Sequence, residues 1–150
     1  MESPEGILDL ISRIRETSSE ILRRELEKEG VTGIVPAHGK IIYHLFHREK
    51  PVPLSEVVKA CGRAKSTITG MAVTLEKHGY LTRTNCRDDK RSVLVELTPK
   101  GRALRESFDE ISRGILDRLY FGMDREEQEA LTGSLSHINR NLKDALALYI

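Results

Sequence analysis

Residues 54–98 contain two helix patterns followed at once by two strand patterns, and this run constrains the fold more than any other part of the chain. The second helix pattern begins at Ala64, and its apolar residues recur at helical spacing: Ile68, Met71, Ala72 and Leu75. Gly79 ends this pattern, because glycine readily takes the left-handed conformation that stops a helix. The segments LTRTNC (81–86) and SVLVELT (92–98) are typical of strands joined by a charged turn.

The face of the second helix opposite this apolar stripe carries mostly short polar side chains and almost no carboxylates. It carries Ser66, Thr69, Gly70, Val73 and Lys77, flanked by Thr67 and Thr74. A solvated helix face normally mixes Glu with Lys, so this composition favours a helix that lies close to an anionic surface. A helix–turn–helix followed by a hairpin with a charged tip is the order of a winged helix, a unit that commonly binds duplex DNA.

Charge is distributed unevenly, although the whole chain is nearly neutral, with 24 Lys and Arg against 23 Asp and Glu. Residues 36–101 hold 12 basic and 6 acidic residues, whereas residues 1–35 hold 5 and 8, and residues 102–150 hold 7 and 9. Phosphate binding needs a local basic surface rather than a basic protein. The distribution therefore favours nucleic-acid binding by residues 36–101, and chance clustering on a solvated surface is the alternative.

The run from Leu54 to Gly101 resembles the MarR family of winged-helix transcriptional regulators. The likeness lies in LSEVVKACG, in STIT followed by LEKHGYLTR, and in the order Asp89-x-Arg91, strand, Leu97-Thr98, Lys100-Gly101. The resemblance implies a mainly α fold with a small β-hairpin wing, and terminal helices intertwined across a dimer. The family often has an arginine where this chain has Gly70, so specificity must shift to neighbouring residues or to DNA shape.

Long apolar stripes at both ends of the chain fit the same organisation. Residues 7–29 and 100–120 predict two long helices; Gly122 ends the second, and Asp124 caps a third. A small winged helix has too little surface to cover the apolar stripes of all three helices. We therefore expect a second copy of the chain, related by a twofold axis, to bury them. An intramolecular three-helix bundle in a monomer is the alternative. We therefore expect one domain, residues 1–150, with dimerisation helices at 1–35 and 102–150 and a winged helix-turn-helix at 36–101.

A further helix is predicted over residues 36–48, beginning at Pro36, and Val52 is expected to add a third strand to the wing sheet. His44 and His47 have a spacing that can hold a metal, but the sequence nominates no third ligand, so we predict no metal and no cofactor. The resemblance implies a small phenolic or apolar effector between the DNA-binding and dimer regions. Its identity is unknown, and Tyr43 and His44 are candidates for its site.

The two cysteines do not form a disulfide framework in such a protein. Cys61 falls on the apolar side of its helix, so we expect a buried core residue. Cys86 lies near Arg83, Arg87 and Arg91 in the sequence, and positive neighbours favour a thiolate. Oxidant sensing through Cys86 is therefore left open beside a purely structural role.

Catalysis has no support in the sequence, because the motifs of serine hydrolases, zinc proteases and phosphate loops are absent. The pair Asp88–Asp89 lies in an exposed turn, where nothing would separate the two pKa values for acid–base work. We find no signal peptide and no apolar run long enough to span a bilayer, so a cytoplasmic protein without membrane partners is expected.

The predicted function is a homodimeric transcriptional repressor that binds a pseudo-palindromic duplex operator and is released by a small-molecule effector. A winged helix used as a protein-interaction module is the alternative, and it would call for an apolar outward face on the second helix. The predicted DNA-binding residues are Arg63, Lys65, Ser66, Thr67, Thr69, Gly70, Val73, Lys77, Arg83, Arg87, Lys90 and Arg91.

Each predicted contact follows from side-chain chemistry. The hydroxyls of Ser66, Thr67 and Thr69 hydrogen-bond phosphates or base edges, Val73 touches a thymine methyl, and Gly70 lets the helix backbone approach. Phosphates are neutralised by Lys65, Lys77 and Arg83. Arg91 acts in the minor groove with help from Lys90 and Arg87, and Asp89 orients Arg91 through a charge-assisted hydrogen bond.

Overall fold

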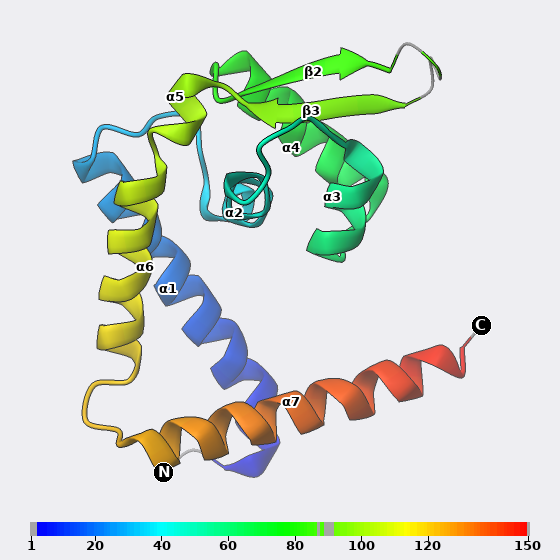
Figure 1. Cartoon of the computed structure of the whole chain (residues 1–150). Helices are drawn as coiled ribbons and strands as arrows, with labels where there is room; N and C mark the ends of the chain where they lie inside the picture. The colour runs from blue at the N-terminus through cyan, green and yellow to red at the C-terminus, as the bar shows by residue number, and fades with distance from the viewer. Residues whose placement is uncertain (1–2, 87, 89–91, 150) are drawn as a thin grey trace. The chain divides into compact units, whose positions relative to one another are not determined.

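The computed structural model describes residues 3–86, 88 and 92–149, and the chain forms two compact units, Met1–Arg113 and Gly114–Ile150 (Figure 1). The first unit begins with a 3-10 turn at Pro4–Gly6 and a long helix, α1, at Ile7–Lys28. The other elements are the 3-10 turn Pro36–His38, α2 (Gly39–Phe46), β1 (Val52–Pro53), α3 (Leu54–Cys61), α4 (Lys65–Lys77), β2 (Leu81–Asn85), β3 (Val93–Leu97), α5 (Pro99–Arg102), α6 (Arg105–Leu119) and α7 (Arg125–Ala147).

The described strands form one antiparallel sheet in the order β1-β3-β2. β2 pairs with β3 from Leu81 opposite Leu97, and Val52 of β1 pairs with Val95 on the other side of β3. The predicted hairpin and the predicted third strand are both confirmed. Helices α2, α3 and α4 pack against this sheet (Figure 1).

The helix–turn–helix is built as the apolar spacing predicts. Gly62 ends α3 with a left-handed φ of 62°, and Gly79 follows α4 with a φ of 80°. The apolar residues of α4 supply the inward face: Ile68, Ala72 and Leu75 are each 0% exposed. They join a core that includes Ile41, Ile42, Leu45, Val57, Leu81 and Val95. The mainly α fold with a small β wing is therefore confirmed.

The hairpin is joined to α5 by a tight packing of two backbone segments. The Thr98 backbone N–H donates to the Tyr80 carbonyl at 3.0 Å, and the Thr98 hydroxyl donates to the Gly79 carbonyl at 2.6 Å. Gly101 lies against the same segment so closely that a Cβ there would be 2.1 Å from the Tyr80 carbonyl oxygen. The glycine of the Leu97-Thr98-x-x-Gly101 sequence is thus a steric requirement.

The prediction of one helix over residues 100–120 is wrong, because the structure divides this segment into α5 and α6. The break falls at Ala103 and Leu104, where the Leu104 N–H donates to the Gly101 carbonyl at 3.2 Å, a spacing of three residues rather than four. The packing of Gly101 on Tyr80 fixes the direction of α5, so the chain turns before α6 begins.

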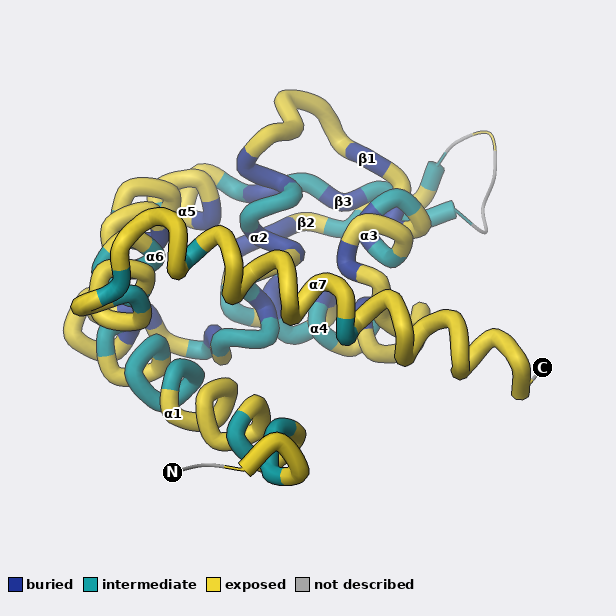
Figure 2. Tube along the Cα trace, turned by 90° about the horizontal axis from the view of Figure 1, so that it is seen from below, coloured by how far each residue is buried: buried dark blue, intermediate teal, exposed yellow. Residues whose placement is uncertain are grey.

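Helix α7 belongs to the second unit, and Asp124 caps its N-terminus as predicted. The Glu127 N–H donates to Asp124 Oδ1 at 2.9 Å, and the Asp124 N–H donates to Glu127 Oε2 at 2.8 Å. The structure describes α7 along its whole length and shows no buried residue in it (Figure 2). Its exposed apolar residues include Leu131, Leu135, Leu142 and Leu146. No helix in the described part of the chain is long and apolar enough to cross a membrane.

Candidate nucleic-acid interface

The outward face of α4 presents most of the residues predicted to bind DNA. Exposed positions on or just before this helix are Arg63, Lys65, Ser66, Thr67, Gly70, Val73 and Lys77. Val73 is 43% exposed although it is apolar. Thr69 is half-buried, and its hydroxyl donates to the Lys65 carbonyl at 2.8 Å, so it offers mainly acceptor lone pairs outward. Hydroxyl, basic and backbone groups therefore share one accessible surface.

Arg83 is held by an acidic partner, Glu76, that spacing along the chain does not indicate. Its Nε and Nη2 donate to Glu76 Oε1 at 3.1 and 3.0 Å, and its backbone N–H donates to Glu76 Oε2 at 3.0 Å. Glu76 stands on α4 and Arg83 on β2, so the pair joins the helix to the wing. The guanidinium that was predicted to neutralise phosphate is already paired with a carboxylate.

The predicted contacts at the tip of the wing lie outside the described residues. This applies to Arg87, Asp89, Lys90 and Arg91. Cys86, at the end of β2, is a half-buried free cysteine whose backbone N–H donates to the Ser92 carbonyl at 2.9 Å. Its role as an oxidant sensor stays a prediction. Cys61 is buried as expected, and burial raises the pKa of its thiol.

His44 and His38 take part in hydrogen bonds within the fold. His44 Nε2 lies 2.9 Å from Glu56 Oε1, which also accepts from Arg48 Nε at 2.8 Å. These bonds, first that of Arg48 and then that of His44, lower the pKa of Glu56 and tie α2 to α3. His38 is buried, and its Nδ1 accepts from the Val35 N–H at 3.0 Å. No cluster of potential metal ligands occurs among the described residues.

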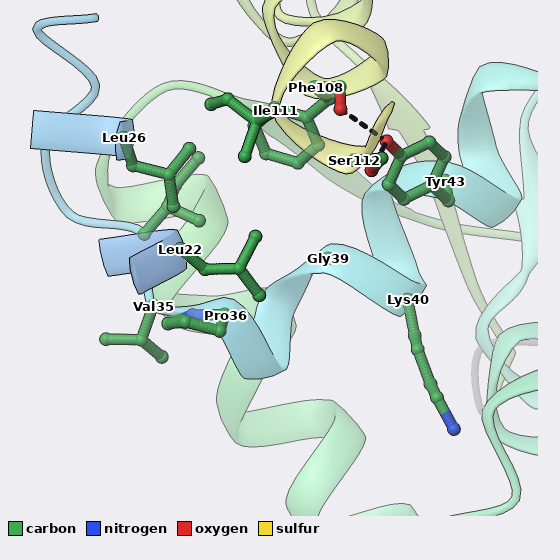
Figure 3. Close-up of a pocket in the computed structure, with 11 residues that line it drawn as sticks. Leu22, Leu26, Val35, Pro36, Gly39, Lys40, Tyr43, Phe108, Ile111 and Ser112 are labelled. Carbon is green, nitrogen blue, oxygen red and sulfur yellow. Dashed lines mark hydrogen bonds between the residues drawn. The ribbon is translucent and has the colours of Figure 1, made fainter. Parts of the chain in front are cut away.

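A cavity of about 220 Å³ lies inside the first unit (Figure 3). Its lining comes from α1, the segment before α2, α2 and α6: Leu22, Leu26, Ile34, Val35, Pro36, Gly39, Lys40, Tyr43, Phe108, Ile111 and Ser112. The Tyr43 hydroxyl donates to the Phe108 carbonyl at 2.7 Å and lies 2.5 Å from Ser112 Oγ. The Lys40 side chain extends away from the other labelled side chains (Figure 3). Of the two predicted effector residues, Tyr43 lines this cavity and His44 is absent from its lining.

A family model described as a winged helix DNA-binding domain matches residues 36–101, the same segment that the sequence predicted as the winged helix-turn-helix. The crystal structure of MarR shares the fold with a TM-score of 0.72 at 18% identity, covering 92% of this chain and 98% of that chain. The chain therefore has the fold of MarR and contains a segment similar to winged helix DNA-binding domains.

Two further proteins resemble this chain in structure or in sequence. The crystal structure of an S. aureus MepR–DNA complex matches with a TM-score of 0.79 at 20% identity, over 94% of this chain and 99% of that chain. The transcriptional repressor YetL of Bacillus subtilis is 35% identical over 80 residues, which cover 51% of this chain and 46% of that protein. The chain spans between 46% and 63% of the length of the curated relatives that it matches. These relatives are transcriptional regulators by name.

Proposed function

We propose that this protein is a member of the MarR family and acts as a cytoplasmic, homodimeric, DNA-binding transcriptional regulator. The observation that carries the proposal is the outward face of α4, where exposed Lys65, Ser66 and Lys77 surround a glycine at position 70. A helix of this kind suits the major groove, in which hydroxyls and ammonium groups meet base edges and phosphates. An interaction module for another protein would need an apolar face there, and Val73 is the one large apolar side chain exposed on α4, which the structure describes in full.

The contacts are divided between α4 and the wing. Lys65 and Lys77 neutralise phosphates near the two ends of α4. Ser66 and Thr67 reach phosphates or base edges, and Thr69 accepts from a donor on a base edge. Val73 contacts a thymine methyl. Arg91, aided by Lys90 and Arg87 and oriented by Asp89, supplies a minor-groove contact from the wing, as the sequence predicts.

Dimerisation is proposed from the apolar surface that the terminal helices expose. Leu8 and Ile14 of α1 are 63% and 50% exposed, and Leu142 and Leu146 of α7 are 56% and 69% exposed. Soluble proteins rarely leave long apolar stripes uncovered. A second copy of the chain covers them economically, because a twofold arrangement brings the same stripe of each copy against its mate. Two copies of α4 then read the half-sites of a pseudo-palindromic operator.

Release by an effector is proposed to act through the cavity of Figure 3. Its lining side chains are apolar apart from Lys40, Tyr43 and Ser112, so an uncharged, mainly apolar molecule is the fitting ligand. Ile34 and Val35 of the lining belong to the connector, residues 29–35, which joins α1 to the turn before α2.

The connector also contacts the end of α4, which gives the cavity a route to the DNA-binding surface. The Tyr80 hydroxyl donates to the Thr32 carbonyl at 2.8 Å. Gly33, with a φ of +79°, lies so close to His78 that a Cβ at this position would be 2.0 Å from the imidazole Cδ2. A ligand that displaces Ile34 therefore also moves Thr32 and Gly33, which contact the turn between α4 and β2. The repressor leaves its operator when this movement shifts α4 away from the DNA.

The function is tested by selecting bound duplexes from a random pool with the purified full chain. The expected result is a pseudo-palindromic site whose half-sites are centred about 10 base pairs apart. Failure to enrich any duplex would reject DNA reading and favour the protein-interaction alternative.

Effector release is tested by titrating a panel of neutral aromatic and aliphatic molecules into the complex with the selected duplex. The matched variant is Gly39→Leu, because Gly39 lines the cavity and a Cβ added there meets nothing within 4 Å. Compounds that weaken DNA binding by the natural chain should fail to do so with the variant. Equal responses of both proteins would place the effector site elsewhere.

A further inference from the structure

The Glu76–Arg83 pair is the structural feature that the predicted set of DNA contacts leaves unexplained. Both carboxylate oxygens of Glu76 are used, since Oε1 accepts from the Arg83 side chain and Oε2 from the Arg83 backbone N–H. The two side chains are only partly exposed, 28% for Arg83 and 37% for Glu76. Two hydrogen bonds from the guanidinium and one from the backbone N–H hold Arg83 on this carboxylate more firmly than a single surface ion pair would.

Glu76 occupies an unusual place on the proposed DNA-binding helix. It is the one carboxylate among the thirteen residues of α4. It follows Lys65 by eleven residues, about three helical turns, and therefore lies on the same side of the helix as Lys65. A carboxylate there faces the surface that phosphates approach, where an unpaired negative charge would oppose binding.

Pairing changes what Arg83 contributes to DNA binding. A guanidinium that already meets a carboxylate carries little net charge outward, so it releases few counterions when a duplex binds. Contacts to phosphate hold the protein on any sequence, whereas base contacts distinguish one sequence from another. Withholding one cation from the phosphates therefore lowers the affinity for every duplex by a similar factor and makes binding less dependent on salt.

We propose that Glu76 limits the sequence-independent affinity of this surface for DNA, because it neutralises Arg83 and keeps its guanidinium from acting as a phosphate contact. The same hydrogen bonds hold β2 against α4, so the wing and the helix approach DNA as one piece. This inference rests on the proposed function, because it concerns how strongly that DNA-binding surface holds phosphates.

The first test compares Glu76→Gln with Glu49→Gln, which removes the same charge at an exposed position outside α4 and the hairpin. Each protein is titrated with the selected duplex and a scrambled duplex at several salt concentrations. Glu76→Gln should bind the scrambled duplex severalfold more tightly, and its log–log salt slope should become more negative by about one unit per protomer. Glu49→Gln should match the natural slope. An unchanged slope for Glu76→Gln would overturn the proposal.

A double variant, Glu76→Gln with Arg83→Met, distinguishes charge pairing from a purely structural role. It also allows the salt slope to be measured if the single variant Glu76→Gln folds poorly. Removing both charges should leave the salt slope equal to that of the natural chain. A slope shallower by about one unit per protomer would show that Arg83 contacts phosphate in the natural protein, contradicting the inference. If the natural chain binds no duplex at all, it is the proposed function that fails.

Discussion

The substitution Gly70→Ala is expected to move stability and DNA affinity in opposite directions. Gly70 lies in the interior of α4, where glycine costs about 0.5–1 kcal/mol relative to alanine because its backbone loses more freedom on folding. A Cβ added at this position meets no atom within 4 Å, so no steric cost offsets the gain. The free energy of unfolding should therefore rise by about 0.5–1 kcal/mol.

The same methyl group is expected to weaken DNA binding. It extends about 1.5 Å from a backbone that is proposed to approach the groove closely. A displacement of about 1 Å lengthens a hydrogen bond of ordinary length beyond its useful range. Because each hydrogen bond contributes about 0.5–1.5 kcal/mol net, losing one or two from Ser66 and Thr69 should cost about 1–2 kcal/mol, roughly a tenfold loss of affinity.

The assay combines urea unfolding at a fixed protein concentration with titration of the selected duplex. Lys77→Ala is the control for affinity, since it should lower the salt slope by about one unit per lost contact without raising stability. A Gly70→Ala protein that is more stable and binds as tightly as the natural chain would refute the close approach of this face to DNA.

Three further predictions concern the fold that positions this face. Gly101→Ala should lower the free energy of unfolding by about 2–4 kcal/mol, measured by urea, because its Cβ would meet a backbone carbonyl at 2.1 Å; an ordinary urea midpoint would contradict that packing. Gly33→Ala should destabilise the chain, and adding His78→Ala should recover part of the loss, since the imidazole is the group in the way; strict additivity of the two changes would argue against the contact. Burial and then the charge of His78 lower the pKa of His38, so the folded chain favours the neutral ring. The free energy of unfolding should therefore fall as the pH drops below about 6.5, the value for an unfolded histidine, because only the unfolded chain binds the proton readily. His38→Ala should flatten that part of the pH–stability curve.

Local spacing was sufficient to predict the winged helix. The apolar repeat of Ile68, Ala72 and Leu75 identified the inward face of α4, and the strand patterns identified β2 and β3 within a residue or two of their ends. These signals work because each depends on residues that are neighbours along the chain.

Features that depend on contacts between distant segments could not be predicted in this way. The break between α5 and α6 follows from Gly101 packing on the Tyr80 carbonyl, and the cavity depends on Tyr43 meeting Phe108, 65 residues away. Glu76 is an intermediate case: its isolation as the one carboxylate of α4 is visible in the sequence, whereas its pairing with Arg83 requires the turn from α4 into β2.

The most direct test of the central account is the salt dependence of duplex binding by the full chain. If the basic surface of residues 36–101 meets phosphate in both protomers, the slope of log affinity against log salt should be more negative than about −4 between about 50 and 200 mM. An affinity that does not change with salt, or no binding to any duplex below about 100 mM salt, would contradict DNA binding by this surface.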